Sequence, residues 1–126
     1  MGHKLLLVDD EPHFVLSLEF LMQQAGFQVS AVDGGEAALE ALGRDKPDLV
    51  LLDVMLPGED GFSICEAIRA RAEWGDVKIV MFTARGRQVE REKALALGAD
   101  AFIVKPFAAQ EVMGTISRLL APVSDD

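Results

Sequence analysis

Three aspartates stand where short apolar runs of the sequence end. An apolar run over residues 5–8 leads into Asp9 and Asp10, and a second run over residues 49–52 leads into Asp53. If both runs are neighbouring buried parallel strands, their carboxyl ends bring three negative charges into one crevice. Like charges at close range raise each other's pKa unless a cation offsets them. The pattern therefore predicts a cation site.

Mg²⁺ is the cation that this set of residues favours. It is a hard ion that binds oxygen ligands, commonly uses one or two carboxylates, and leaves positions for water or phosphate. Two more polar residues follow apolar runs directly: Thr83 after residues 79–82, and Lys105 after residues 102–104. Threonine would supply a hydroxyl and lysine a point charge for phosphate. The aspartates, Mg²⁺ and Lys105 together carry no net formal charge, so the crevice could accept a phosphoryl group.

The elements that must position these residues alternate along the chain. Four runs rich in branched side chains or Phe predict strands buried on both faces: residues 5–8, 49–52, 79–82 and 102–104. A strand at the sheet edge is predicted where Phe27, Val29 and Ala31 alternate with polar residues.

Helix-length segments lie between the predicted strands. Apolar stripes at helical spacing occur at Val15, Leu18, Leu21 and Met22; at Ala38, Leu39 and Leu42; at Phe62, Cys65, Ile68 and Ala72; and at Val112, Met113, Ile116, Leu119 and Leu120. Pro12 suits the first turn of the first helix, and Asp33 with Glu36 resembles a capping box before the second. Residues 86–93 are almost wholly polar, so the fourth helix is expected to bury only its C-terminal half, with Leu95 and Leu97. Such a weakly packed helix is a candidate for movement.

This alternation predicts an α/β fold: a doubly wound five-stranded parallel sheet of order 2-1-3-4-5 with about five flanking helices. In that order the functional crevice lies between strands one and three. The length of 126 residues and the hydrophobic content of 50% fit one domain.

Composition excludes several classes of function. A formal charge of -9 disfavours direct binding to nucleic acid or to an anionic membrane surface. No apolar run approaches the length that spans a bilayer, so we expect a soluble cytoplasmic protein. A single cysteine excludes an internal disulfide, and Cys65 is expected to pack in the core. His3 and His13 lack partners at metal spacing and are expected on the surface.

With these residues at these positions, the chain resembles the receiver domain of two-component response regulators. The matching segments are Val8-Asp9-Asp10-Glu11-Pro12, residues 51–58 with Asp60-Gly61, Phe82-Thr83-Ala84, and residues 98–102 leading to Lys105-Pro106-Phe107. They occur in order from Lys4 to about Leu120, on the flavodoxin-like fold that the resemblance implies.

The resemblance implies a role for each residue of the crevice. Asp53 would accept a phosphoryl group from a histidine kinase or a histidine phosphotransfer protein. Asp10, Asp53 and the backbone carbonyl of Met55 would bind Mg²⁺, and Asp9 would hold it through water. Lys105 would pair with a phosphoryl oxygen.

The resemblance also implies a switch. Thr83 and Ala84 would contact the phosphoryl group, and drawing the Thr83 hydroxyl inward would let Phe102 turn from exposed to buried. The surface of the fourth helix, fifth strand and fifth helix would then change. A cis Lys105-Pro106 bond would aim Lys105 into the crevice.

Some positions depart from relatives that dimerise through a charged network. Ala101 and Thr115 stand where an acid and an arginine are expected, which weakens the prediction of that dimer, although oligomer formation on phosphorylation stays possible. Met55 and Arg85 are expected to tune the lifetime of the phosphoryl group.

Three alternatives stay open. A Mg²⁺-dependent aspartyl phosphohydrolase usually carries a second acid where Met55 stands, so we expect no turnover enzyme, although the chain would catalyse its own phosphorylation and dephosphorylation. A flavodoxin-like cofactor binder would need a phosphate-cradling loop where Asp9, Asp10 and Glu11 stand. A pseudo-receiver used only for interaction would not need an intact crevice.

Residues 1–126 are expected to form a single receiver domain, with a core over about 4–120 and no output domain. Such a chain either acts alone on an unknown downstream protein or belongs to a larger regulator, and the sequence does not decide between these.

Overall fold

The computed structural model describes residues 3–56, 59–84 and 86–121, apart from the side chain of Glu59. Its middle layer is a sheet of five strands, β1 (Lys4–Val8), β2 (Gln28–Val32), β3 (Leu49–Asp53), β6 (Lys78–Thr83) and β7 (Ala101–Val104). The strand order is β2-β1-β3-β6-β7, and every pairing is parallel. Since β6 and β7 are the fourth and fifth strands of this sheet, the predicted order 2-1-3-4-5 is confirmed. A short antiparallel pair, β4 (Met55–Leu56) and β5 (Glu59–Asp60), was not predicted.

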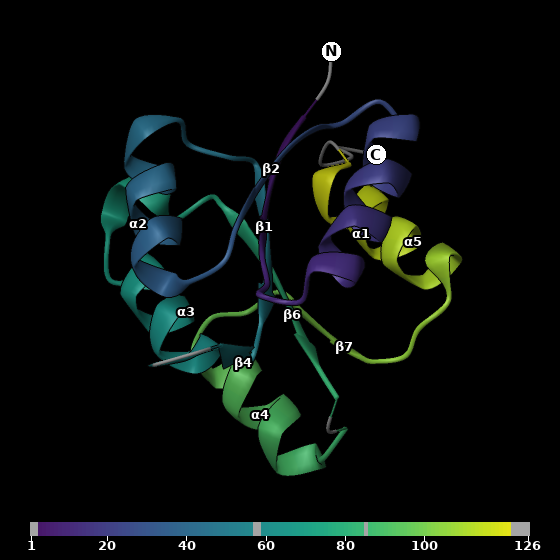
Figure 1. Ribbon diagram of the computed structural model, residues 1–126. Coiled ribbons are helices and arrows are strands. Elements are labelled where there is room, and N and C mark those ends of the chain that lie inside the picture. Colours follow the sequence, from purple (N-terminus) through teal and green to yellow (C-terminus); the bar gives the residue numbers. More distant parts are fainter. Residues whose placement is uncertain (1–2, 57–58, 85, 122–126) are drawn as a thin grey trace, which may run out of the picture.

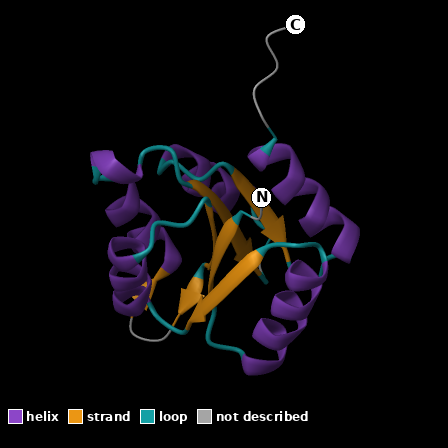
Figure 2. Ribbon diagram, turned by 90° about the horizontal axis from the view of Figure 1, so that it is seen from above, coloured by secondary structure: helices purple, strands orange, loops and turns teal. Residues whose placement is uncertain are grey.

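In the described residues, five helices cover the two faces of the sheet, which agrees with the prediction of about five (Figures 1 and 2). They are α1 (Pro12–Gln24), α2 (Gly35–Arg44), α3 (Gly61–Arg69), α4 (Gln88–Ala96) and α5 (Ala109–Leu120). Helices α1 and α5 pack on one face, whereas α2, α3 and α4 pack on the other. A short 3-10 helix, η1 (Ala72–Trp74), follows α3.

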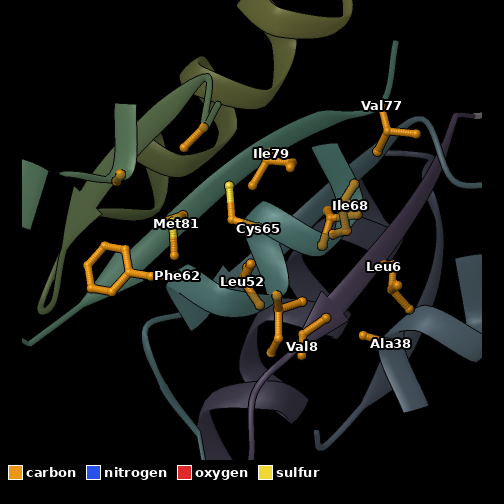
Figure 3. Packing of buried hydrophobic residues seen from close by; sticks show 14 of the residues in the cluster. Leu6, Val8, Ala38, Leu52, Phe62, Cys65, Ile68, Val77, Ile79 and Met81 are labelled. Carbon is orange, nitrogen blue, oxygen red and sulfur yellow. The ribbon is translucent and has the colours of Figure 1, made fainter. Parts of the chain in front are cut away.

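The sheet separates two apolar cores. Side chains alternate along β1, so that Leu6 and Val8 enter the core under α2 and α3 (Figure 3), while Leu5 and Leu7 enter the core under α1 and α5. Cys65 is completely buried in the first core, which confirms its predicted packing role. Burying a Leu or Ile side chain completely contributes about 1.5–3 kcal/mol, so these two cores supply most of the favourable free energy of folding.

The edge strand β2 is only partly covered. It pairs with β1 alone, as predicted, and Val29 and Val32 are half-buried. Ala31 was expected on the covered face but is exposed, because a groove lined by Pro12 and Val15 runs beside it.

Two local expectations about helices were wrong, and a third was only partly right. The predicted capping box at Asp33 is not formed, because α2 begins later, at Gly35, and its N-cap residue Gly34 has no side chain to accept a bond. Ala72 is exposed, because α3 ends at Arg69 and the chain turns into η1. The C-terminal part of the fourth helix supplies the buried surface, as predicted, through Ala94 and the partly buried Leu97, but Leu95 is 46% exposed.

In the part of the chain that the structure describes, no helix is both long enough and apolar enough to cross a membrane.

Candidate functional site

The polar residues predicted from the strand ends converge at one edge of the sheet. Asp53 is the last residue of β3 and lies opposite Phe82 of β6, and Thr83 lies opposite Val104 of β7. Asp9 follows β1, which pairs with β3 up to its own last residue. Because the strands are parallel and in register, their carboxyl ends finish at the same level. The crevice predicted between strands one and three is therefore present.

Three carboxylates gather in this crevice. Asp9, Asp10 and Asp53 each place one oxygen within 4.8 Å of the other two. Asp9 and Asp53 are 2% and 7% exposed, whereas Asp10 is open to solvent. Backbone amides orient the two buried groups: Glu11 N donates to Asp9 Oδ1 at 2.9 Å, and Met55 N donates to Asp53 Oδ1 at 3.1 Å. Two buried acids and one exposed acid form a cluster that is open on one side.

Lys105 supplies the positive charge of the site. Its Nζ lies 3.0 Å from Asp9 Oδ2 and 3.6 Å from Asp53 Oδ2. Its backbone amide donates to Thr83 O at 2.7 Å, which continues the β6–β7 pairing past the end of β7. The Lys105-Pro106 peptide bond is cis, as predicted. The lysine thus reaches back across the sheet edge to both buried carboxylates.

The electrostatics of the cluster favour a bound cation. Burial raises the pKa of Asp53 above its ordinary value, and the negative charge of Asp9 raises it further; the Met55 amide and Lys105 oppose this rise. One lysine beside three carboxylates leaves the cluster with excess negative charge. All the side-chain atoms that could coordinate a metal in this cluster are carboxylate oxygens, which suit a hard dication such as Mg²⁺ better than a thiophilic metal.

Gly61 holds the loop after Asp53 in place, a role that was not predicted from the sequence. Its amide donates to Val54 O at 2.7 Å, and a Cβ atom at this position would collide with Asp53 O and lie 2.9 Å from Val54 Cα. Asp60, the N-cap of α3, accepts from Ser63 N at 2.8 Å. The first turn of α3 is thus pressed against the backbone of Asp53. The pair Asp60-Gly61 before an apolar stripe was the available signal.

Phe14 is a second residue of the site that was not predicted from the sequence. The Nζ of Lys105 lies 3.9 Å from the centroid of its ring. The signal was present in the sequence, since Phe14 lies one helical turn before Leu18 and two turns before Met22, both buried residues of α1.

The predicted switch residues lie where the sequence placed them. Thr83 is 1% exposed, and Ala84 beside it is exposed. Phe102 is only 5% exposed, and the guanidinium of Arg91 lies 5.6 Å from its ring centroid. The structure therefore contains the buried position of this ring; its exposed position, and its exchange between the two, stay a prediction.

The remaining predicted residues have mixed outcomes. The side chain of Met55 is 56% exposed beside the cluster, while Arg85 lies outside the described residues, as do Pro57 and Gly58 of the matching motif. His3 and His13 are exposed, which confirms their surface position.

The family described as the response regulator receiver domain matches residues 5–117. The sensory transduction protein RegX3 of Mycobacterium bovis is 39% identical over 121 residues, which are 96% of this chain and 52% of the relative. The chain thus spans about half the length of the curated relatives it matches.

Solved structures agree in fold over nearly the whole chain. A putative response regulator from Chloroflexus aurantiacus has a TM-score of 0.92 at 33% identity, over 97% of this chain and 100% of the other. The receiver domain of a sensor histidine kinase from Pseudomonas aeruginosa has a TM-score of 0.88 at 31% identity, with the same coverage of 97% and 100%. That structure is described with a magnesium ion coordinated in its active-site cleft.

Proposed function

The chain belongs to the response regulator receiver domain family, and from that premise we propose that it is a phosphorylation-activated signalling switch whose phosphoacceptor is Asp53. The observation that carries this proposal is the buried Asp53 carboxylate, which has two further carboxylates within 4.8 Å and the Lys105 ammonium at 3.6 Å. The phosphodonor is a histidine kinase or a histidine phosphotransfer protein, in keeping with the receiver domain of a sensor histidine kinase among the similar structures.

The chemistry is a transfer between two side chains. One Asp53 oxygen attacks phosphorus in line with the phosphohistidine nitrogen; the new O–P bond forms as the N–P bond breaks, and the bonding pair returns to the imidazole. An ionised aspartate needs no general base. Lys105 Nζ, already within 3.6 Å of Asp53, is placed to pair with an equatorial oxygen as charge develops there.

We assign the metal site to the same residues. Asp10, Asp53 and the Met55 carbonyl would hold Mg²⁺, with Asp9 contributing through water. When bound, the metal neutralises charge on the transferring phosphoryl group. Backbone amides orient one oxygen of Asp9 and one oxygen of Asp53, which supports this assignment.

The output is a change of surface. Phosphorylated aspartate carries close to two negative charges and several acceptor oxygens, to which Thr83 would donate. We propose that this coupling fixes Phe102 and changes the face formed by α4, β7 and α5. Helix α4 suits such a role, because Ala94 is its one buried residue.

We propose that residues 1–126 act as one receiver domain without turnover of a free substrate. The downstream partner is a protein or an output domain. An output domain would agree with the lengths of the curated relatives, which are about twice as long as this chain. One of them is named a transcriptional regulatory protein. With a net charge of -9, the domain itself is not expected to bind nucleic acid.

Incubation with a small phosphodonor such as acetyl phosphate, with and without Mg²⁺, tests the proposal. We expect one base-labile acyl phosphate per chain, dependent on Mg²⁺, and none in Asp53→Asn. Asp76→Asn, which changes an exposed aspartate paired with Lys46, is the matched control and should label like the wild type. Equal labelling of Asp53→Asn would overturn the assignment, and sustained release of phosphate over many turnovers would point to a phosphohydrolase.

A further inference from the structure

An aromatic ring stands on a third side of the Lys105 ammonium. Besides its two carboxylate partners, the Nζ atom lies 3.9 Å from the ring centroid of Phe14. A cation within about 6 Å of a ring centroid is attracted by the negative charge density of the ring face. The lysine side chain is only 22% exposed, so water screens this attraction weakly.

The Phe14 ring is itself held in place from three elements. It makes edge contacts with Phe82 of β6 and with Phe107 after β7, with centroids 5.7 Å apart in both cases and interplanar angles of 80° and 75°. Those two rings lie 5.2 Å from each other. At the start of α1, Glu11 Oε2 accepts from Phe14 N at 2.7 Å. The ring is thus a fixed wall, whereas the lysine side chain is long and flexible.

Asp9 has two competing partners in the proposed reaction. It is the nearest anion to Lys105, at 3.0 Å, and it is also one of the acids assigned to Mg²⁺. When the metal engages Asp9, the lysine loses part of its strongest attraction at the moment when it must stay beside Asp53. The ring carries no charge and offers no ligand to a hard dication, so its attraction for the ammonium does not change.

Resting on the proposed function, we propose that Phe14 is a positioning residue, whose ring keeps the Lys105 ammonium beside Asp53 while Mg²⁺ occupies the carboxylates. The competing explanation is that the ring only fills apolar space. The two differ in what they require: positioning needs an aromatic face, whereas packing needs volume.

Two substitutions separate these requirements. Phe14→Leu keeps an apolar side chain of similar size on α1 but removes the ring face. Phe14→Tyr keeps the face, and Phe14 lines a groove of about 480 Å³ that gives room for the added hydroxyl. Emission of the single tryptophan, Trp74, which is 4% exposed, reports whether each variant is folded.

The first measurement is nuclear magnetic resonance on lysine-labelled protein without phosphodonor. The methylene protons next to Lys105 Nζ, assigned by their loss in Lys105→Ala, should be shifted upfield by the Phe14 ring. We expect the shift to persist at saturating Mg²⁺ in the wild type and in Phe14→Tyr, and to be absent in Phe14→Leu. Disappearance of the shift when Mg²⁺ is added to the wild type would overturn the proposal.

The second measurement is the initial rate of Mg²⁺-dependent labelling of Asp53. We expect Phe14→Leu to be slower by about three- to tenfold and Phe14→Tyr to stay within about twofold of the wild type. In a Lys105→Ala background, Phe14→Leu should slow the rate no further, because the ring acts through the lysine.

The two proposals fail in different ways. Wild-type rates in Phe14→Leu, or equal slowing with and without Lys105, would reduce Phe14 to a packing residue while Asp53 labelling still supports the switch. A wild-type protein that is never labelled on Asp53 would overturn the switch, and the resonance measurement would still decide whether the ring holds the lysine.

Discussion

Burying the ionised carboxylate of Asp53, a single residue, lowers the stability of the folded protein. Its carboxylate is 7% exposed beside Asp9, and burial together with that neighbouring charge raises its pKa above the ordinary value of 3.8. The folded state therefore holds a proton on Asp53 more tightly than the unfolded chain does. Stability from the protonated form is fully present below the ordinary pKa and is lost as pH rises through the raised pKa.

We predict that Asp53→Asn unfolds at a higher temperature than the wild type at pH 7 without metal, by a few degrees. The neutral amide avoids burying a charge next to Asp9. Below the ordinary pKa of aspartate, the wild-type carboxyl is protonated and therefore also neutral, so the difference in unfolding temperature should shrink. Thermal unfolding in chelator-containing buffer at several pH values, followed by Trp74 emission, measures this. A difference that grows toward acid pH would contradict the assigned direction of the pKa shift.

At the scale of elements, the contact between α3 and the loop after β3 sets the geometry of the phosphoacceptor. Gly61 permits it, because its Cα faces the carbonyl of Asp53 with no room for a side chain. A second link lies at the far end of α3, where Arg69 donates to Gly98 O at 2.9 Å and to Asp100 Oδ2 at 2.9 Å. Helix α3 is thus tied at both ends and buries five of its residues, whereas α4 buries Ala94 alone.

We predict that Gly61→Ala costs about 1–3 kcal/mol of stability and slows labelling of Asp53, because the backbone atoms that it meets must move. Gly114→Ala in α5 is the control: a Cβ there meets nothing within 4 Å, and replacing a helical glycine should stabilise by about 0.5–1 kcal/mol. Denaturant unfolding and initial labelling rates measure both effects. If Gly61→Ala is destabilised but is labelled at the wild-type rate, the contact at Gly61 does not affect phosphorylation of Asp53.

The whole molecule has a formal net charge of -9, and folding brings three of its acidic side chains together at the carboxyl edge of the sheet. The unfolded chain does not assemble this cluster. A dication that binds only the folded state must therefore raise its stability by mass action.

We predict that Mg²⁺ at ten times its dissociation constant raises the free energy of unfolding by about 1.4 kcal/mol. Asp10→Asn should lose most of this gain, because it removes the exposed carboxylate of the cluster. Asp76→Asn should keep it. Thermal or urea unfolding with and without Mg²⁺ at fixed ionic strength measures the gain, and an equal gain in Asp10→Asn would show that the ion acts elsewhere.

The architecture and the polar residues of the site could be predicted from the sequence alone. Buried apolar runs and helical stripes are local patterns, so the five strands and their helices could be recognised from neighbouring residues. The sheet order and the parallel strands then placed Asp9, Asp10, Asp53, Thr83 and Lys105 at one edge, because parallel strands end on the same side. The structure confirms that placement.

The distances between separate elements, in contrast, are known only from the three-dimensional structure. The ring of Phe14 reaches Lys105 across 91 positions of the sequence, and Gly61 faces the backbone of Asp53. Both contacts depend on distances between separate elements, which local periodicity does not encode. The same reason explains the failed capping box at Asp33: α2 begins at Gly35, and the burial of Ala38 in the core that contains Leu6 and Val8 outweighs the preference of the local sequence.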